Sequence, residues 1–196
     1  GYPHEDALIL FRYVENFSHN YEIAFNLDGE KTEGATDFLW FYILSIFNLF
    51  GLNVVVSSII INSFSFLVII KSIKKNLIES KDLAYYPFFI FLLLNIGSIC
   101  LSSIYGFSTL FFLSLGLLCY VSILNKSYIN WTIFSILFCL TRPEGVLIFI
   151  PTIFIFFNQT QKNEKTKFFN SFLIICFAGL IYFLWRFYYF ENFLPL

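Results

Sequence analysis

The sequence predicts an all-α protein, a polytopic bundle of transmembrane helices, and three observations support this fold class. Of the 196 residues, 58% are hydrophobic, 22% are aromatic and only 13% are charged, whereas about a quarter of the residues in a soluble domain are charged. Apolar runs alternate with short polar breaks from Phe38 onward. Most of the lysines gather in a few of those breaks. A water-soluble core of this size could not bury so much apolar surface, so the lipid bilayer is the expected solvent.

We expect one membrane domain over residues 1–196, made of three parts. Residues 1–37 form an extracytoplasmic loop, which holds eight of the thirteen acidic residues and two of the twelve basic residues. Residues 38–186 form the transmembrane helices, and residues 187–196 begin another outer loop. Because the chain starts at Gly1 and contains no Met, we also expect a fragment that lacks at least one preceding membrane span and a following part.

The first loop begins with a stretch that is typical of an amphipathic helix, EDALILFRYVEN at residues 5–16. Its apolar residues recur at helical spacing and form one stripe, made of Ala7, Leu10, Phe11 and Val14. Glu5, Arg12 and Asn16 fall together on the opposite side, and Asp6 and Tyr13 share the neighbouring edge. Such a helix would lie on the outer membrane face with its charged groups turned to one side. The alternative is an ordinary solvated face with a local ion pair.

The second half of the first loop, FNLDGEKTEGATDFLW at residues 25–40, leads into the first apolar segment. Its turn-forming residues indicate an irregular loop; they are Asn26, Asp28, Gly29 and Gly34. Glu30 and Glu33 are expected to be carboxylates on the outer side. Trp40 is expected to anchor the chain at the membrane interface.

The apolar segments that follow are expected to be helices near residues 38–51, 52–70, 84–104, 107–124, 128–141, 145–157 and 168–186. A spanning helix needs about 20 residues. Residues 38–51 are therefore expected to be interfacial or half-inserted, and residues 128–157 a pair of short crossings.

The lysines predict how these helices are oriented. Eight of the nine lysines crowd three breaks, which hold Lys71, Lys74, Lys75 and Lys81, then Lys126, and then Lys162, Lys165 and Lys167. The positive-inside rule places these breaks in the cytoplasm. Alternation then places residues 1–37, 105–106, 142–145 and 187–196 on the outer side.

All three arginines, Arg12, Arg142 and Arg186, fall on that outer side. One explanation is chance together with side chains that snorkel at helix ends. The other is a phosphate site, because the planar guanidinium group binds phosphate through two parallel hydrogen bonds. Charges at membrane depth cost roughly 2.5–3.5 kcal/mol each and therefore suggest function.

A polar break interrupts the apolar stretch FCLTRPEGVLIF at residues 138–149. Pro143 and Gly145 are expected to end one short helix and start the next at the outer rim. That turn would present Arg142 to a site, with Glu144 holding or orienting an arginine. The alternative is a tight membrane hairpin whose ion pair is only local.

The cysteines and histidines predict neither a disulfide nor a metal site. The four cysteines lie inside apolar runs, where a thiol behaves as a small hydrophobic group; they are Cys100, Cys119, Cys139 and Cys176. His4 and His19 are too few for a metal cluster. The acids of the first loop could hold a divalent cation, but nothing in the sequence requires one.

Together these stretches resemble the C-type (GT-C) membrane glycosyltransferases related to the terminal arabinofuranosyltransferase of mycobacterial cell-wall assembly. That family has an acidic pair, a short helix with Arg-Tyr and Asn, and then Phe-Asn-x-Gly-Glu-x-Val-Glu-Gly-Tyr-Thr-Asn-Phe-Leu-Trp. The matching residues of the first loop are Glu5, Asp6, Ala7, Ile9, Arg12, Tyr13, Asn16, Phe25, Asn26, Gly29, Glu30, Glu33, Gly34, Thr36, Phe38, Leu39 and Trp40. Residues 142–145 match an Arg-Pro-Glu-Gly element, and RFYYFENFLPL at 186–196 resembles Arg-x-x-Tyr-Phe-Gly-x-x-Leu-Pro-Asn.

The chain also departs from this pattern. Glu5 stands where Asp is usual, Asp28 is an insertion, and residues 20–22 replace a Gly-x-Gly. Thr32 and Ala35 replace Val and Tyr. Ser108 stands where the family has the Glu of Gly-Met-Glu-Thr, which puts one acceptor or structural contact in doubt.

The resemblance implies an inverting glycosyltransferase of the cytoplasmic membrane with its active site on the outer face. It would move a sugar from a polyprenyl-phosphate donor to a cell-envelope glycan or lipid acceptor, in contact with membrane lipids and without a nucleic-acid partner. By analogy the base is Asp6, with Glu5 second, and the donor phosphate is bound by Arg12, Arg142 and Arg186. The supporting residues are Tyr13, Asn16, Asn26, Glu30, Glu33 and Glu144.

Three other functions remain open or are disfavoured. A transporter or flippase of lipid-linked sugars usually carries its charges near the membrane midplane, whereas here they gather at one face. A membrane acyltransferase would show a His-based motif within the membrane region, and both histidines lie in the first loop. A non-catalytic subunit with a degenerate site remains open because of Ser108.

Overall fold

The computed structural model describes residues 3–20, 22–26, 33–75 and 86–192. Within these ranges the chain is helical and contains no strand, which confirms the predicted all-α class. In chain order the described helices are α1 (Glu5–Asn20), α2 (Phe38–Leu49), α3 (Val54–Ile73), α4 (Tyr86–Ile104), α5 (Thr109–Leu124), α6 (Tyr128–Thr141), α7 (Glu144–Gln159), the short 3₁₀ helix η3 (Lys162–Glu164) and α8 (Lys165–Phe190).

Every apolar segment expected from the sequence forms a helix, and the ends differ only by a few residues. α3 begins at Val54 because the side chain of Asn53 caps it, accepting hydrogen bonds from the backbone N–H groups of Val55 and Val56. α8 is longer than expected at both ends. At its start hydropathy does not mark the helix end, because Lys165 and Lys167 favour helices about as well as apolar residues do.

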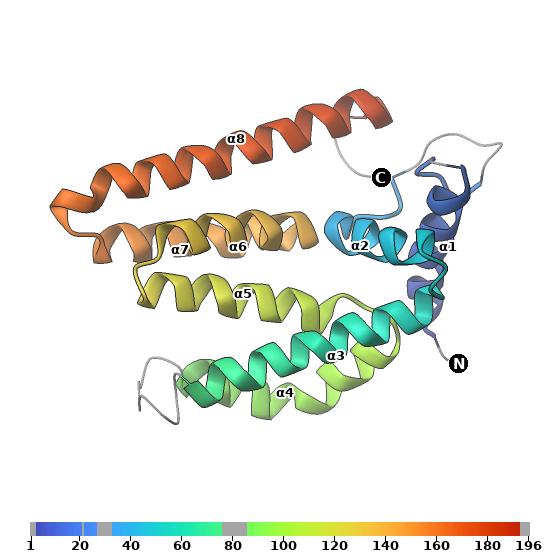
Figure 1. The fold of residues 1–196 in the computed structure, drawn as a ribbon, viewed down its shortest axis with the longest axis horizontal. Coiled ribbons are helices and arrows are strands. Elements are labelled where there is room, and N and C mark those ends of the chain that lie inside the picture. The colour runs from blue at the N-terminus through green and yellow to red at the C-terminus, as the bar shows by residue number, and fades with distance from the viewer. Residues whose placement is uncertain (1–2, 21, 27–32, 76–85, 193–196) are drawn as a thin grey trace.

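The helices α3 to α8 run side by side, and α1 lies across one end of them (Figure 1). Within this layer α5 contacts α3, α4, α6 and α7, and α6 also contacts α7 and α8. α2 lies between α1 and the end of α6 (Figure 1) and contacts both, as well as α3.

Two helical stretches of the described chain, Val54–Ile73 and Lys162–Phe190, are long and apolar enough to cross a membrane. The remaining apolar helices of the described chain are shorter. Large apolar side chains also cover much of the outer surface, for example Phe64 on α3, Leu147 on α7 and Phe177 on α8. Monomeric soluble proteins rarely expose contiguous apolar patches of more than a few hundred Å².

The apolar stripe predicted for α1 is present, and it packs on α2. Ala7, Phe11 and Val14 are buried together with Phe41 and other residues of α2. The expectation for Trp40 is wrong: this side chain does not lie at an interface but is buried, and its Nε1–H donates to the backbone oxygen of Gly106, 3.3 Å away. Because α1 packs on α2, Trp40 is part of the buried core between them.

The connections between helices alternate between the two ends of the layer. In Figure 1 the turns that join α5 to α6 and α7 to α8 lie at one end, whereas the turns that join α4 to α5 and α6 to α7 lie at the other, beside α1 and the end of α8. The lysines of the described chain belong to the first end; they are Lys71, Lys74, Lys75, Lys126, Lys162, Lys165 and Lys167. Lys31 and Lys81 lie outside the described residues. The three arginines belong to α1, the α6–α7 turn and the end of α8. The predicted membrane orientation depends on this alternation of the connections between the two ends.

Candidate functional site

Two cavities lie where α1, α2 and the end of α8 meet the α6–α7 turn. One is polar and measures about 270 Å³, and the other is mostly apolar and measures about 440 Å³. Thr36 lines both cavities. Arg142 lines the polar cavity, and the next residue, Pro143, lines the apolar one. The two cavities therefore adjoin.

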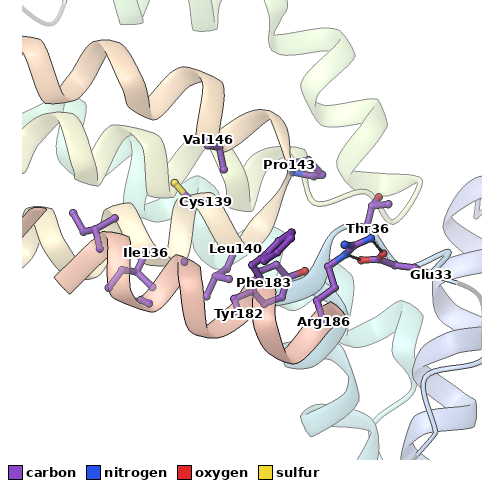
Figure 2. Close-up of a pocket in the computed structure, with 13 residues that line it drawn as sticks. Glu33, Thr36, Ile136, Cys139, Leu140, Pro143, Val146, Tyr182, Phe183 and Arg186 are labelled. Atoms are coloured by element: carbon purple, nitrogen blue, oxygen red, sulfur yellow. Dashed lines mark hydrogen bonds and ion pairs between the residues drawn. The ribbon is translucent and has the colours of Figure 1, made fainter. Parts of the chain in front are cut away.

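The apolar cavity is formed by side chains of α6, α7 and α8 (Figure 2). Its wall consists of Ile136, Cys139, Leu140, Val146, Ile175, Ala178, Gly179, Tyr182 and Phe183. Gly179 leaves the cavity open, because a Cβ atom added there would meet no atom within 4 Å. Glu33 and Arg186 complete the lining and are its charged residues. The space suits an apolar ligand that has a polar group at one end.

Glu33 and Arg186 form a buried ion pair at this cavity. Arg186 Nε donates to Glu33 Oε1 at 2.7 Å, and Arg186 Nη2 donates to Glu33 Oε2. The side chain of Arg186 is only 6% exposed and that of Glu33 only 9%. Such a bidentate pair offsets the desolvation of both charges. Arg186, which the sequence assigns to a phosphate, therefore already has its charge balanced by Glu33.

Asp37, which the predicted site does not include, contributes a carboxylate to the polar cavity. Asp37 Oδ2 accepts a hydrogen bond from Ser108 Oγ at 2.5 Å, and Asp37 Oδ1 lies 3.9 Å from Arg142 Nε. Burial raises the pKa of Asp37. The hydrogen bond from Ser108 and the charge of Arg142 oppose this effect, while Glu144 adds to it.

The sequence holds one signal for Asp37, which directly precedes the apolar run that begins at Phe38. Its hydrogen-bond partner Ser108 is 71 residues away in the chain. Their contact therefore follows only from the packing of the helices.

Arg142 lies in the turn between α6 and α7, with extended backbone angles (φ −147°, ψ 144°). Arg142 Nη2 donates to Glu144 Oε1 at 3.3 Å, an exposed contact between residues two apart in the chain, which fits both interpretations of this turn. The guanidinium carbon lies 5.8 Å from the centre of the Phe112 ring. Its buried Nε has no hydrogen-bond partner among the described residues. An unsatisfied donor of a cation at a cavity wall is suited to an anionic ligand.

Of the predicted residues on α1, only Asp6 lines the polar cavity. Its side chain is 67% exposed, and its Oδ2 lies 3.5 Å from His4 Nδ1. Glu5 and Arg12 are exposed and line neither cavity. The structure thus brings Asp6 and Arg142 to one cavity and Glu33 and Arg186 to the adjoining one, without Glu5 and Arg12.

Tyr13 and Asn16 hold the first loop on α1. Tyr13 Oη accepts a hydrogen bond from the backbone N–H of Gly34 at 3.1 Å, and Asn16 Nδ2 donates to the backbone oxygens of Ala24 and Phe25, both at 2.8 Å. Both side chains are buried. Placing Asn16 on the exposed face with Glu5 and Arg12 is therefore wrong, because the chain at residues 23–25 folds back over it.

The other predicted features of the first loop have different outcomes. Asn26 is exposed and lines neither cavity. Glu30 lies outside the described residues.

Within the described ranges no group of three or more His, Cys, Asp and Glu side chains could hold a metal ion. The four cysteines are free thiols.

Comparisons of the chain with profiles of known protein families, with curated proteins and with solved structures find no match.

Proposed function

We propose that the chain belongs to an inverting glycosyltransferase that moves a sugar from a polyprenyl-phosphate donor to a cell-envelope glycan or lipid on the outer face of the cytoplasmic membrane. The observation that carries the proposal is the pair of adjoining cavities, one apolar and one polar, joined at Thr36. A polyprenyl-phosphate sugar has the same two parts, an apolar chain and an anionic sugar-bearing head.

The apolar outer surface supports a membrane location for the whole helical layer. Its exposed large side chains would be solvated better by lipid than by water. The lysines at one end would face the cytoplasm, since the positive-inside rule concerns lysine and arginine near short connections. Residues of α1, the α6–α7 turn and the end of α8 line the two cavities, and these elements meet at the opposite end of the layer (Figure 1). In this orientation the proposed chemistry would be on the outer side.

Arg142 is the residue best suited to the donor phosphate. Its Nε has no hydrogen-bond partner in the described chain. Its ion pairs with Asp37 and Glu144, at 3.9 and 3.3 Å, are longer and more exposed than the buried pair of Arg186 with Glu33. In a single displacement the acceptor oxygen bonds to the anomeric carbon, and the bond from that carbon to the phosphate oxygen breaks. The electron pair leaves with the phosphate, where the charge of Arg142 stabilises it. The proton of the acceptor hydroxyl passes to a carboxylate of the polar cavity, which the resemblance assigns to Asp6.

The apolar cavity can be tested by filling it. The substitution Gly179→Phe places a ring in open space inside the cavity, and Gly97→Phe is the matched control, because its Cβ on α4 also meets no atom within 4 Å. We expect the purified protein to bind undecaprenyl phosphate more tightly than undecaprenol. Gly179→Phe should weaken that binding by at least about tenfold, or 1.4 kcal/mol, and Gly97→Phe should leave it unchanged.

The same binding experiment has results that would contradict the proposal. Equal binding of undecaprenol and undecaprenyl phosphate would exclude recognition of the phosphate. Unchanged binding in Gly179→Phe would exclude the apolar cavity as the site of the polyprenyl chain. Transfer assays with membranes and a panel of undecaprenyl-phosphate sugars then identify the sugar.

A further inference from the structure

The two carboxylates of the polar cavity have different surroundings. The side chain of Asp6 is 67% exposed, and its Oδ2 lies 3.5 Å from His4 Nδ1. The side chain of Asp37 is 19% exposed and lies at the start of α2. A proton acceptor must keep a fixed position relative to the reacting atoms. Of the two acids, Asp37 is the one whose position the fold determines.

Three elements of the chain fix the carboxylate of Asp37. Asp37 directly precedes α2, Ser108 directly precedes α5, and Arg142 lies between α6 and α7. Ser108 Oγ donates to Oδ2, which leaves Oδ1 on the side of Arg142, 3.9 Å from its Nε. An acceptor hydroxyl bound at Oδ1 would therefore lie beside the cation proposed to hold the phosphate.

We propose that Asp37 is the catalytic residue that takes the proton from the acceptor hydroxyl, an inference that rests on the proposed function. As the acceptor oxygen bonds to the anomeric carbon, its proton moves to Asp37 Oδ1. The bond between that carbon and the phosphate oxygen breaks, and the electron pair leaves with the phosphate beside Arg142. Asp6, at the exposed edge of the cavity, contacts the acceptor without receiving the proton.

The electrostatics of the cavity agree with this role. The charged or titratable groups around Asp37 are Arg142 and Glu144 at the α6–α7 turn and Asp6 across the cavity. Burial raises the pKa of Asp37 above its ordinary value, which makes the carboxylate a stronger base than an exposed aspartate. The ionised carboxylate is therefore favoured less in the folded chain than in the unfolded chain.

The test compares Asp37→Asn with Asp6→Asn, and uses Glu15→Gln as the matched control because Glu15 is an exposed acid of α1 that lines neither cavity. Sugar transfer is measured in membranes, and binding of undecaprenyl phosphate is measured on the same proteins. We expect Asp37→Asn to keep binding but to lower transfer by about 10²–10⁴-fold, the contribution of a general base. Asp6→Asn should lower transfer less than Asp37→Asn, and Glu15→Gln should not change it.

Stability and pH separate a base from a merely structural acid. Because burial raises the pKa of Asp37, wild-type stability should fall as the pH rises from the unfolded-state pKa through the folded-state pKa. In Asp37→Asn the amide oxygen can still accept the hydrogen bond from Ser108. The variant should lose the fall in stability with rising pH. It should therefore unfold no earlier than wild type at neutral pH. The variant Ser108→Ala removes a hydrogen bond that lowers the pKa of Asp37, so the acidic limb of its transfer rate should move to higher pH.

The outcomes distinguish the two proposals. If wild type neither binds undecaprenyl phosphate nor transfers a sugar from such donors, the proposed function fails and the role of Asp37 fails with it. If wild type does both and Asp37→Asn transfers sugar at a near-normal rate, only the role of Asp37 fails. An Asp37→Asn protein that loses transfer only because it unfolds would also overturn that role.

Discussion

The three arginines, which the sequence places on one side of the membrane, have three different surroundings. Arg186 is buried against Glu33, Arg142 is 34% exposed with one unsatisfied donor, and Arg12 is exposed. Their common side follows from counting segments along the chain. Their partners do not follow from it, because Glu33 and Arg186 are 153 residues apart and meet only through packing.

Asp37 shows the same limit for an acid. The sequence shows an aspartate directly before an apolar helix, where acids are common for reasons of capping and helix dipole. In the structure its side chain makes no capping hydrogen bond, and its carboxylate instead contacts Ser108, which directly precedes α5. The two residues are 71 positions apart in the chain, so their contact could not be predicted from the sequence.

The buried pair leads to a prediction about stability. The substitution Glu33→Gln leaves the Arg186 guanidinium buried without its counter-charge, so it should lower the free energy of unfolding by about 3–5 kcal/mol. The double variant Glu33→Leu with Arg186→Met should be far closer to wild type, since replacing both partners removes both desolvation penalties. Unfolding in detergent measures both. A Glu33→Gln protein as stable as wild type would show that the pair does not hold the first loop to α8.

At the scale of elements, the α6–α7 hairpin explains the polar break in the apolar sequence. Pro143 separates the two helices, and Gly145 lets the start of α7 approach the backbone of α6. A Cβ at Gly145 would lie 2.7 Å from the backbone oxygen of Phe138. The local function of the break could be predicted from residue types, because proline and glycine act through the backbone. The contact of Arg142 with the polar cavity could not.

Gly145→Ala should therefore be destabilising, because its Cβ would meet backbone atoms of Phe138 and Cys139 that cannot move without separating the helices. We expect a loss of about 1–3 kcal/mol, as for other overpacked sites. The control Gly97→Ala adds a Cβ in open space on α4 and should stabilise by roughly 0.5–1 kcal/mol, since alanine favours helices more than glycine does. Thermal unfolding in detergent compares the two, and equal effects would exclude a close contact at Gly145.

Helix α1 shows where periodicity fails. The buried stripe was predictable, because α2 provides a single apolar surface for it. The polar face was only partly predictable, because residues 23–25 cover Asn16 while Glu5 and Arg12 remain exposed. A helix that contacts a second chain segment buries two faces, and a search for one stripe detects only the larger.

At the scale of the whole molecule, the order and type of the helices were predictable, whereas their packing was not. Long apolar runs between polar breaks have few solutions in a bilayer, since every backbone group must be paired within its own helix. Which helices adjoin depends on side-chain shape. The cavity between α6, α7 and α8 arises in part from small residues, Ala178 and Gly179, whose sequence context is the same as that of any lipid-facing segment.

The alternation of connections between the two ends predicts which parts of the chain are accessible from outside the cell. In a background with the four cysteines replaced by serine, Asn20→Cys and Glu144→Cys should react with a membrane-impermeant maleimide in intact cells, because both positions are exposed at the α1 end of the layer. Lys75→Cys and Lys162→Cys should react only after permeabilisation, because they belong to the lysine-bearing end. The two pairs control for each other, since all four side chains are exposed in the structure. Labelling of the lysine pair in intact cells, with protection of the other pair, would invert the orientation and move both cavities to the cytoplasmic side, where a donor presented from outside could not reach them.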